Sequence, residues 1–371
     1  MNETNWIQTE NGEFKRNLKF INNQRDEIIL FNDPENKSYK IKNNFSTETQ
    51  ISANTSQNKR EGEWLDDCSR YSFYKETSIN AHKGAVLCLT ILKNGDFASA
   101  SADKNIKIWS SIDSKSKSTL SNHTDKVNAL VVSPNGYLVS GSRDKTIKIW
   151  NNGRVIKSID ANKSIVYSLK YLKDENLAAG SDYVIRIWNT STGIAKTPLA
   201  GHFECVSALA TLKNGDLISG SCDSTIKIWN IETGKLKITL NEHKGLVSSL
   251  VVLENGDLAS SSPDTKIKIW NLKTNQAKLT LSKHSKAVNA LVELKNGFLA
   301  SGSDDKTVRI WDAYSGALIK TIQSFKSSIK SLAVLNNGAL IVGGDGGEIK
   351  VIRTCNVLAS FKFKFFHLIL F

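Results

Sequence analysis

Short apolar runs alternate with polar turns along most of the chain, and the runs return in a fixed order. In one stretch, the apolar run VSALATL (206–212) is followed by the turn Asn214-Gly215, then by DLISGS (216–221) and TIKIW (225–229). A fourth run, ETGKLKITL (232–240), comes next. Runs of this length, rich in β-branched residues and separated by turn signals, predict β-strands. The pattern therefore predicts units of four short antiparallel strands.

The unit repeats at a near-constant period. Its third strand ends in tryptophan six times, with gaps of 41, 38, 41, 41 and 41 residues: Trp109, Trp150, Trp188, Trp229, Trp270 and Trp311. An aspartate stands six residues before each of them: Asp103, Asp144, Asp182, Asp223, Asp264 and Asp305. A histidine stands 27 residues before five of them: His82, His123, His202, His243 and His284. Self-similarity at this period predicts a stacked or closed repeat array.

Two units depart from the pattern. In the third, Asn162 replaces the histidine and lies one residue closer to the tryptophan. A seventh, worn unit carries Phe325, Asp345 and Val351 at the equivalent places. Asn-Gly pairs such as Asn214-Gly215 recur between the first two strands, and both residues tolerate the positive φ of a tight two-residue hairpin. Glu175-Asn176 replaces the pair in the third unit, and this unit lacks one residue.

These motifs resemble the WD-repeat β-propeller family over about residues 70–354. The aspartate that follows tryptophan in the family is present only at Trp311-Asp312. The resemblance implies an all-β, seven-bladed propeller. It also implies a buried hydrogen-bond set of His, Ser, Asp and Trp in each blade. The matching residues are His82, Ser99, Asp103, Trp109, His123, Ser140, Asp144, Trp150, Asp182, Trp188, His202, Ser219, Asp223, Trp229, His243, Ser260, Asp264, Trp270, His284, Ser301, Asp305 and Trp311. Units three and seven lack the histidine, so we expect the loosest blades there.

The grouping of Ser, His and Asp also suggests a hydrolase as an alternative function. A catalytic serine needs exposure, a base and an oxyanion hole. Five copies of one set are better explained as satisfied buried polar groups. The chain has no GxxxxGK[ST] loop, no HExxH and no Cys/His cluster with zinc spacing. We therefore expect no catalytic residue, no cofactor and no metal, and a scaffold or adaptor rather than an enzyme.

Charge suggests the kind of partner. The net charge is +13, and lysines flank the His and Asp loops, which should share one rim of the ring. A positive rim attracts acidic or phosphorylated protein segments. A nucleic-acid-binding propeller is the alternative, although no exposed aromatics interleave with the charge as such binding usually requires. Rim positions that vary between repeats are the candidate partner-binding residues: Lys83, Lys126, Arg143, Phe203, Cys205, Cys222, Lys286 and Asp304. Phe203 and Arg143 are the best candidates for interface anchors.

The five cysteines show no CxxC pair, which argues for a reducing compartment and against a disulfide framework. The N-terminus lacks the pattern of a signal peptide, and no apolar run is long enough to span a bilayer. We therefore expect a cytoplasmic protein that can also be nuclear.

The two ends differ from the repeats. Residues 1–42 predict a small β-rich appendage with Trp6 and two strands around the turn at 32–36, and residues 43–69 a polar linker. Residues 355–371 form an apolar tail that we expect to pack on the propeller, which would span residues 70–354. Either residues 72–79 or residues 356–362 could supply the outer strand of blade seven. We favour 72–79, because joining the first and last repeats removes an open sheet edge.

Overall fold

The computed structural model describes residues 6–8, 14–16, 74–173, 176–295 and 297–354. The chain divides into two compact units, residues 1–72 and 73–371. In the first, β1 (Trp6–Gln8) pairs antiparallel with β2 (Phe14–Arg16). The strands expected around residues 32–36, the linker at 43–69 and the tail at 355–371 lie outside the described residues.

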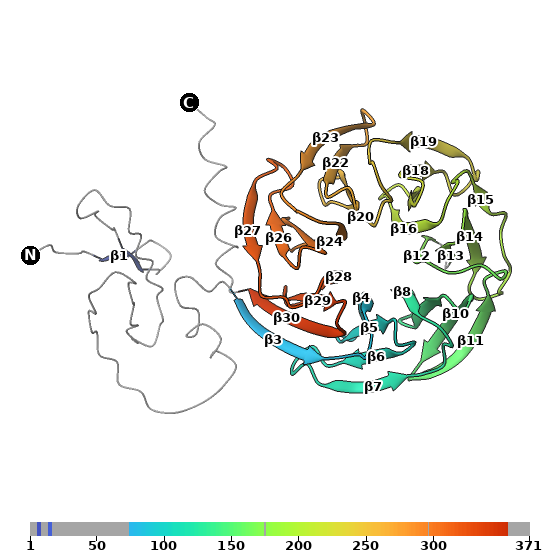
Figure 1. The fold of residues 1–371 in the computed structure, drawn as a ribbon, viewed down its shortest axis with the longest axis horizontal. Coiled ribbons are helices and arrows are strands. Elements are labelled where there is room, and N and C mark those ends of the chain that lie inside the picture. The colour runs from blue at the N-terminus through green and yellow to red at the C-terminus, as the bar shows by residue number, and fades with distance from the viewer. Residues whose placement is uncertain (1–5, 9–13, 17–73, 174–175, 296, 355–371) are drawn as a thin grey trace, which may run out of the picture. The chain divides into compact units, whose positions relative to one another are not determined.

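The second unit is a ring of seven four-stranded antiparallel sheets, so the predicted seven-bladed propeller is confirmed (Figure 1). Blade 1 consists of β4 (Val86–Ile91), β5 (Phe97–Ser101), β6 (Ile106–Trp109) and β7 (Ser116–Leu120). Blade 2 consists of β8 (Val127–Val132), β9 (Leu138–Ser142), β10 (Thr146–Asn151) and β11 (Arg154–Asp160). Blade 3 consists of β12 (Ser168–Tyr171), β13 (Asn176–Gly180), β14 (Val184–Asn189) and β15 (Leu199–Ala200). Blades 4 and 5 are β16 (Val206–Thr211), β17 (Leu217–Ser221), β18 (Ile226–Trp229), β19 (Leu236–Leu240); and β20 (Ser249–Val252), β21 (Leu258–Ser261), β22 (Ile267–Asn271), β23 (Gln276–Leu281). Blades 6 and 7 are β24 (Val288–Glu293), β25 (Leu299–Ser303), β26 (Val308–Trp311), β27 (Leu318–Ile322); and β28 (Ile329–Val334), β29 (Leu340–Gly344), β30 (Glu348–Thr354), β3 (Tyr74–Asn80).

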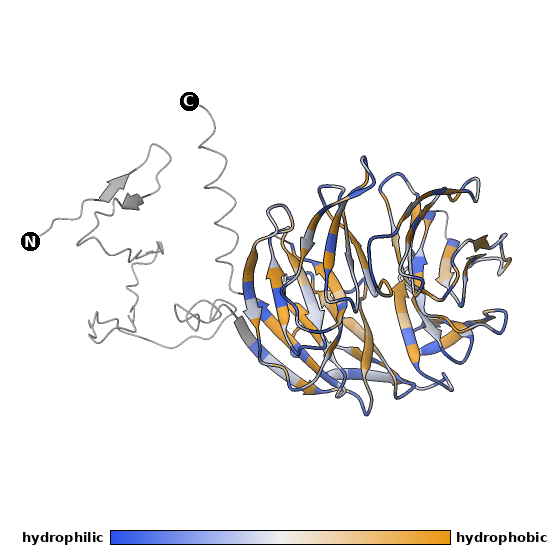
Figure 2. Cartoon of the chain, turned by 45° about the horizontal axis from the view of Figure 1, so that its top comes forward, coloured by the Kyte–Doolittle hydropathy of each residue, from blue (hydrophilic) through white to orange (hydrophobic). Residues whose placement is uncertain are grey.

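Burial explains the composition of the strands. Second strands such as β17 are buried at every residue, because neighbouring blades cover both faces of the sheet. Outer strands such as β11 alternate between exposed and partly buried residues. Apolar residues accordingly lie mainly in the strands and hydrophilic residues in the loops (Figure 2). This difference in burial explains the two sequence patterns that predicted the strands: continuous runs of apolar or small residues in the second strands, and alternating runs in the outer strands.

Neighbouring blades hold one another together. Each repeat tryptophan packs against the preceding blade: Trp188, for example, lies in a cluster with Val139 and Ile147 of blade 2. At six of the seven seams between blades, a side chain at or near the start of one inner strand also donates a hydrogen bond to a carbonyl at, or two residues before, the start of the next inner strand. These bonds are Asn128 to Val166, Ser168 to Val206, Ser207 to Val247, Ser248 to Val288, Asn289 to Ile329 and Ser331 to Val86. The blades therefore form a nearly continuous hydrogen-bonded ring around the axis.

The first and last repeats share blade 7. β3 pairs with β30 in seven residue pairs, from Tyr74 with Thr354 to Asn80 with Glu348. The backbone N–H groups of Ala81 and His82 also donate to the carbonyl of Gly347. The prediction that residues 72–79 supply the outer strand is confirmed, with observed bounds of 74–80.

The structure corrects the predicted hairpin at the Asn-Gly pairs. In blade 1 the N–H of Gly95 donates to the carbonyl of Leu92, and the N–H of Leu92 donates to the carbonyl of Asp96. The loop therefore has three residues, with a type I turn followed by a glycine in the left-handed region. Gly95 has a φ of 86°, whereas Asn94 is not among the residues of positive φ. The two-residue hairpin was wrong because only one of the two residues needs positive φ.

Two register predictions were also wrong. In blade 3 the N–H of Leu172 bonds the carbonyl of Asn176, as the N–H of Leu212 bonds the carbonyl of Asp216 in blade 4. Asn176 therefore matches Asp216, the residue after the Asn-Gly pair, and Glu175-Asn176 do not replace that pair. The residue that the third unit lacks is missing from the turn between the second and third strands, which closes from Ser181 to Val184. In blade 7, Leu340 pairs with Ile352 as Phe97 pairs with Trp109. Ile352 and Gly346 therefore occupy the Trp and Asp positions, each one residue later than predicted.

Candidate functional site

The four side chains of each set form one chain of hydrogen bonds. In blade 5, His243 Nδ1 lies 2.9 Å from Asp264 Oδ2 and His243 Nε2 lies 2.7 Å from Ser260 Oγ. The Trp270 indole N–H donates to the same Ser260 oxygen at 2.8 Å. The same bonds occur in blades 1, 2, 4 and 6. The structure thus joins five of the predicted sets through serines at the assigned positions.

The hydrogen bonds connect Ser, His and Asp as in a catalytic triad, but the serine is not accessible to a substrate. The carboxylate can only accept, so Nδ1 carries the imidazole hydrogen and Nε2 accepts the hydroxyl hydrogen of serine. The serine oxygen in turn accepts the indole N–H. Ser260 has no exposed surface, and Ser99, Ser140, Ser219 and Ser301 have none either. A substrate carbonyl could not reach an oxygen that is enclosed and already bonded on both sides.

Burial and hydrogen bonding set the charge of each pair. Burial lowers the pKa of His243 below its ordinary value and outweighs the opposing attraction of Asp264. The other four histidines of the sets show the same lowering for the same reason. Burial works to raise the pKa of Asp223, but the hydroxyl of Thr225 and the N–H of Phe203 lower it to about 2. Each set therefore holds a neutral imidazole against a carboxylate near neutral pH.

The aspartate of each set also fixes the two loops at one end of the blade. We call these the entry loop, which precedes the inner strand, and the middle turn, which joins the second and third strands. Asp223 Oδ2 accepts the N–H of Phe203, the residue after His202, at 3.0 Å, and Oδ1 accepts the N–H of Thr225 at 2.9 Å. The residue after the aspartate takes positive φ in all five blades: Lys104, Lys145, Ser224, Thr265 and Lys306. We call the face built by the entry loops and middle turns the loop rim.

Each intact set therefore presents two side chains outward. One follows the histidine and the other follows the aspartate. At the first position the five blades carry Lys83, Thr124, Phe203, Lys244 and Ser285, all of them exposed. Their backbone N–H groups are bound to the aspartate, so the side chains are the free part. The hydrogen-bonded His, Ser, Asp and Trp are the same in these five blades, whereas the exposed side chains that they position differ from blade to blade.

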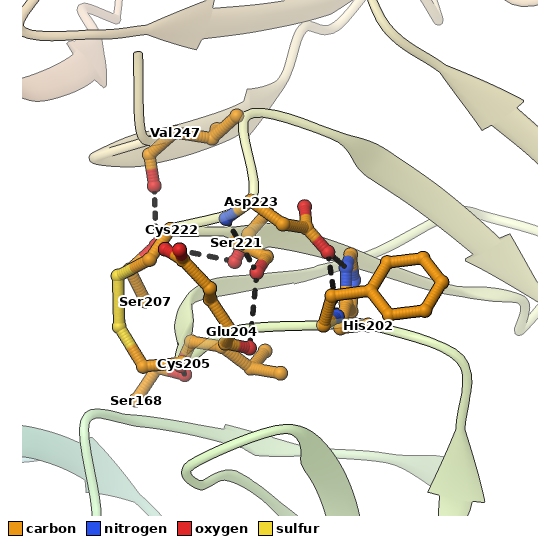
Figure 3. The surroundings of a disulfide bond; sticks show 12 residues. Ser168, His202, Glu204, Cys205, Ser207, Ser221, Cys222, Asp223 and Val247 are labelled. Atoms are coloured by element: carbon orange, nitrogen blue, oxygen red, sulfur yellow. Dashed lines mark hydrogen bonds and ion pairs between the residues drawn. A yellow bond between two sulfur atoms is a disulfide. The ribbon is translucent and has the colours of Figure 1, made fainter.

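A further pair of positions joins the two loops directly. Cys222 N–H donates to the Cys205 carbonyl, and Arg143 N–H donates to the Lys126 carbonyl in the same way. Ala287 and Asp304 occupy these positions in blade 6. Cys205 and Cys222 are bonded as a disulfide, with their Cα atoms 5.2 Å apart, beside His202 and Asp223 (Figure 3). The cysteine count argued against a disulfide framework, and this pair corrects that expectation. The two cysteines are 17 residues apart in the sequence, but the fold places their loops opposite each other on the rim.

The predicted partner-binding residues fall on this rim but differ in exposure. Lys83, Lys126, Arg143 and Lys286 are exposed, and Phe203 is 84% exposed. Asp304 is instead bound to the ammonium of Lys330 and to Asn289, both at 2.7 Å, so its carboxylate is engaged within the propeller.

Charge is distributed unevenly around the loop rim. Blades 1 and 2 contribute exposed Lys83, Lys104, Lys126, Arg143 and Lys145. At the positions next to its histidine and aspartate, blade 4 contributes exposed Phe203 and half-buried Ser224 in their place. Tyr183 in the middle turn of blade 3 is 61% exposed, a signal that the sequence patterns did not single out. A basic sector and an exposed aromatic residue therefore lie on the same face.

Blades 3 and 7 lack the full set. Asp182 sits in a shortened turn, and Ala179 occupies the serine position of blade 3, although Trp188 remains in the core. In blade 7, buried Phe325 replaces the histidine, and the Lys350 ammonium lies 4.9 Å from the centre of its ring.

Two further features of the described residues bear on other functions. No three or more His, Cys, Asp or Glu side chains in that part of the chain gather as metal ligands. None of its helices has the length and apolarity that crossing a membrane would require.

Comparison with known families gives one result. A model described as "WD domain, G-beta repeat" matches residues 73–110, 114–151, 153–189, 194–230, 234–271 and 275–312. The comparison with curated protein sequences finds no match.

Proposed function

The chain belongs to the WD40-repeat family, and from this premise we propose that it is a non-enzymatic scaffold or adaptor for other proteins. It binds its partners on the loop rim, through acidic or phosphorylated segments. The fold is one that typically serves protein interaction, while fold alone does not assign a partner. The observation that carries the proposal is the constant frame of His, Ser, Asp and Trp that displays variable side chains.

The displayed side chains favour an anionic partner. The basic sector of blades 1 and 2 groups four lysines with Arg143, while Asp125 is the acid in the entry loop of blade 2. Complementary charge speeds association and selects partners more than it adds affinity. Arginine also binds phosphate through two parallel N–H bonds.

Phe203 and Arg143 are the proposed anchors. Phe203 exposes 84% of its surface although its backbone is held by Asp223. Arg143 is exposed, and its backbone is held by the Lys126 carbonyl. Aromatic and arginine side chains dominate interface energies when they are positioned before binding.

Affinity capture with the full chain, followed by mass spectrometry, tests the proposal. We expect Arg143→Ala and Phe203→Ala each to deplete a common set of captured proteins at least fivefold. The control is Ile112→Ala, which removes an exposed side chain from the turn between the third and outer strands of blade 1, on the opposite face of the ring. Loss of partners only in the control variant, or turnover of a substrate by the pure protein, would refute the proposal.

Nucleic-acid binding is the alternative that the net charge of +13 favours. It predicts binding to unrelated nucleic acids that weakens steeply with salt, because phosphate contacts release counterions. A scaffold for specific proteins predicts weak nucleic-acid binding at physiological salt. A salt titration of both kinds of complex separates the two functions.

We also propose a cytoplasmic or nuclear location, and the Cys205–Cys222 pair offers a sharp test. Reducing compartments keep most cysteines as thiols. Microscopy of the tagged chain gives its location, and thiol labelling of protein taken from cells gives the state of the pair. A fully oxidised pair in protein from the secretory pathway would contradict the proposed location.

A further inference from the structure

The face opposite the loop rim carries a repeated ion pair. In blades 1, 4 and 5 an aspartate ends the turn between the first two strands and binds a lysine at the start of the outer strand. The pairs are Asp96–Lys117 at 2.7 Å, Asp216–Lys237 at 2.7 Å and Asp257–Lys278 at 3.2 Å. In these three blades the two positions therefore carry side chains of opposite charge.

Blades 2 and 6 replace both partners together with apolar residues. Lys237 follows Leu236, the residue that pairs with Trp229, and Ile156 likewise follows Val155, which pairs with Trp150. Tyr137 ends the first turn of blade 2 at the place of Asp216. The matching residues of blade 6 are Phe298 and Ile319. Ile156 remains 53% exposed and Ile319 46% exposed, so the exchange exposes apolar surface.

In blade 2 the apolar pair opens into a pocket of about 200 Å³ at the seam with blade 3. Tyr137, Ile149 and Ile156 come from blade 2 and Tyr171 from the inner strand of blade 3. Thr190 and Ser191 border it from the last turn of blade 3. Ile194, 68% exposed, belongs to that same turn. Exposed apolar surface beside a pocket is typical of an interaction site.

The charges that the described residues bring to this pocket are positive. Lys157 is the charged residue among those that line it. Its ammonium bonds the carbonyls of Thr190 and Ser191 at 2.9 and 3.2 Å. The ammonium of Lys93 bonds the carbonyl of Pro134, another lining residue. Among the described residues, both ammonium groups are bound by carbonyl oxygens and not by carboxylates, so an acidic group of a partner can pair with them.

We propose that this pocket is a second docking site, which takes one large apolar side chain from an acidic segment of a partner protein. Small-molecule sites usually enclose about 300–1,000 Å³, so the observed volume suits a single side chain instead. Acidic residues beside that side chain would meet Lys93 and Lys157. The site is separate from the loop rim, and a scaffold with both could hold two partners at once.

The test uses the full chain and fluorescent peptides whose central residue is Leu, Phe or Trp between flanking aspartates. We expect saturable binding by anisotropy for at least one peptide. Binding should fall at least tenfold when the central residue is Ala, and when lysines replace the aspartates. Tyr137→Asp with Ile156→Lys should also weaken it at least tenfold. That double variant installs the ion pair of blades 1, 4 and 5, so it should fold.

The matched control is Phe298→Asp with Ile319→Lys, which makes the same exchange in blade 6 and should leave binding unchanged. Equal binding by the two double variants, or no saturable binding of any peptide, would overturn the proposal. So would a dimer in sedimentation velocity that Tyr137→Asp with Ile156→Lys dissolves, because the occupant would then be a second copy of this chain. A single Ile156→Lys variant should bind the peptides more weakly while its melting temperature stays unchanged. This result separates a loss of binding from a loss of folding.

Discussion

In each intact blade, one serine hydroxyl connects the indole ring of the tryptophan with the imidazole ring of the histidine. Ser260 Oγ accepts from Trp270 and donates to His243, and all three groups are buried. The residue types and spacing in the sequence indicated this set, because its geometry repeats. Spacing could not show that the side chains after His and Asp would be the displayed ones. That follows from backbone bonds to the aspartate, such as that from Phe203.

Removing the hydroxyl should be costly. Ser260→Ala leaves the Trp270 N–H and His243 Nε2 without their partner in a buried site. Each unsatisfied buried group costs about 1–3 kcal/mol, so for two groups we expect a loss of about 2–6 kcal/mol in the free energy of unfolding. Urea denaturation measures it. Ser285→Ala, an exposed serine on the rim, should change stability by less than about 0.5 kcal/mol. Equal effects would contradict the role assigned to the hydroxyl.

The histidines should make the protein sensitive to mild acid. Their folded pKa values are lowered by burial, so the unfolded chain binds protons more readily than the folded chain. Stability is then fully present above the unfolded pKa of about 6.5 and is lost as pH falls below it. Each proton taken up on unfolding contributes about 1.4 kcal/mol per pH unit.

We therefore expect the melting temperature to fall steadily between pH 7 and pH 5, before the carboxylates titrate. Calorimetry at several pH values measures the fall. The lowered pKa of aspartates such as Asp264 adds a second loss only below about pH 4. A melting temperature that stays constant from pH 7 to pH 5 would show that the imidazoles do not titrate on unfolding.

At the scale of the element, the sequence predicted the strands well and the turns less well. Strand positions follow from burial, because β17 and its equivalents must be apolar or small throughout. Turn length does not follow from residue type alone. Asn-Gly fits both a two-residue and a three-residue hairpin, and a closing bond such as Leu92 to Asp96 decides between them. The missing residue of blade 3 could likewise be assigned to either of two turns until the pairing was known.

Blade 3 should be the least stable blade. Its outer strand β15 has only two residues, and the buried Ser181 Oγ, Asn176 Oδ1 and Arg186 Nε lack hydrogen-bond partners. The histidine set that fixes the rim of five other blades is absent. Local opening is favoured where buried contacts and satisfied bonds are few.

Hydrogen exchange measured by mass spectrometry tests this expectation. We expect amides of β14 and β15 to exchange at least tenfold faster than those of β18 and β19, the same strands in blade 4. Blade 4 has the complete set, so it is the matched reference. Equal protection in the two blades would mean that packing of Trp188 alone stabilises blade 3.

For the whole molecule, closure joins segments that are far apart in the sequence. The chain offered two candidate strand segments for one open edge, and local pattern favoured neither strongly. β3 has the advantage that it ties the first repeat to the last, and the Ser331 bond to Val86 continues the inner ring across the same seam. The inner-ring bonds escaped prediction because single Ser or Asn residues in apolar strands look like ordinary variation.

Closure by β3 makes the N-terminal segment essential for stability. Removing residues 1–80 deletes all seven pairs with β30 and exposes an open sheet edge. We expect the melting temperature to fall by more than about 10 °C, and by less than about 2 °C when residues 355–371 are removed. A point variant checks the cause: Ile79→Asp places a carboxylate against the cluster that contains Val351, whereas neighbouring Ser78→Asp lies on the exposed side of the same strand. Only Ile79→Asp should lower the melting temperature and promote aggregation through the open edge. If removal of residues 355–371 proves the more damaging change, the tail and not β3 closes the ring in solution.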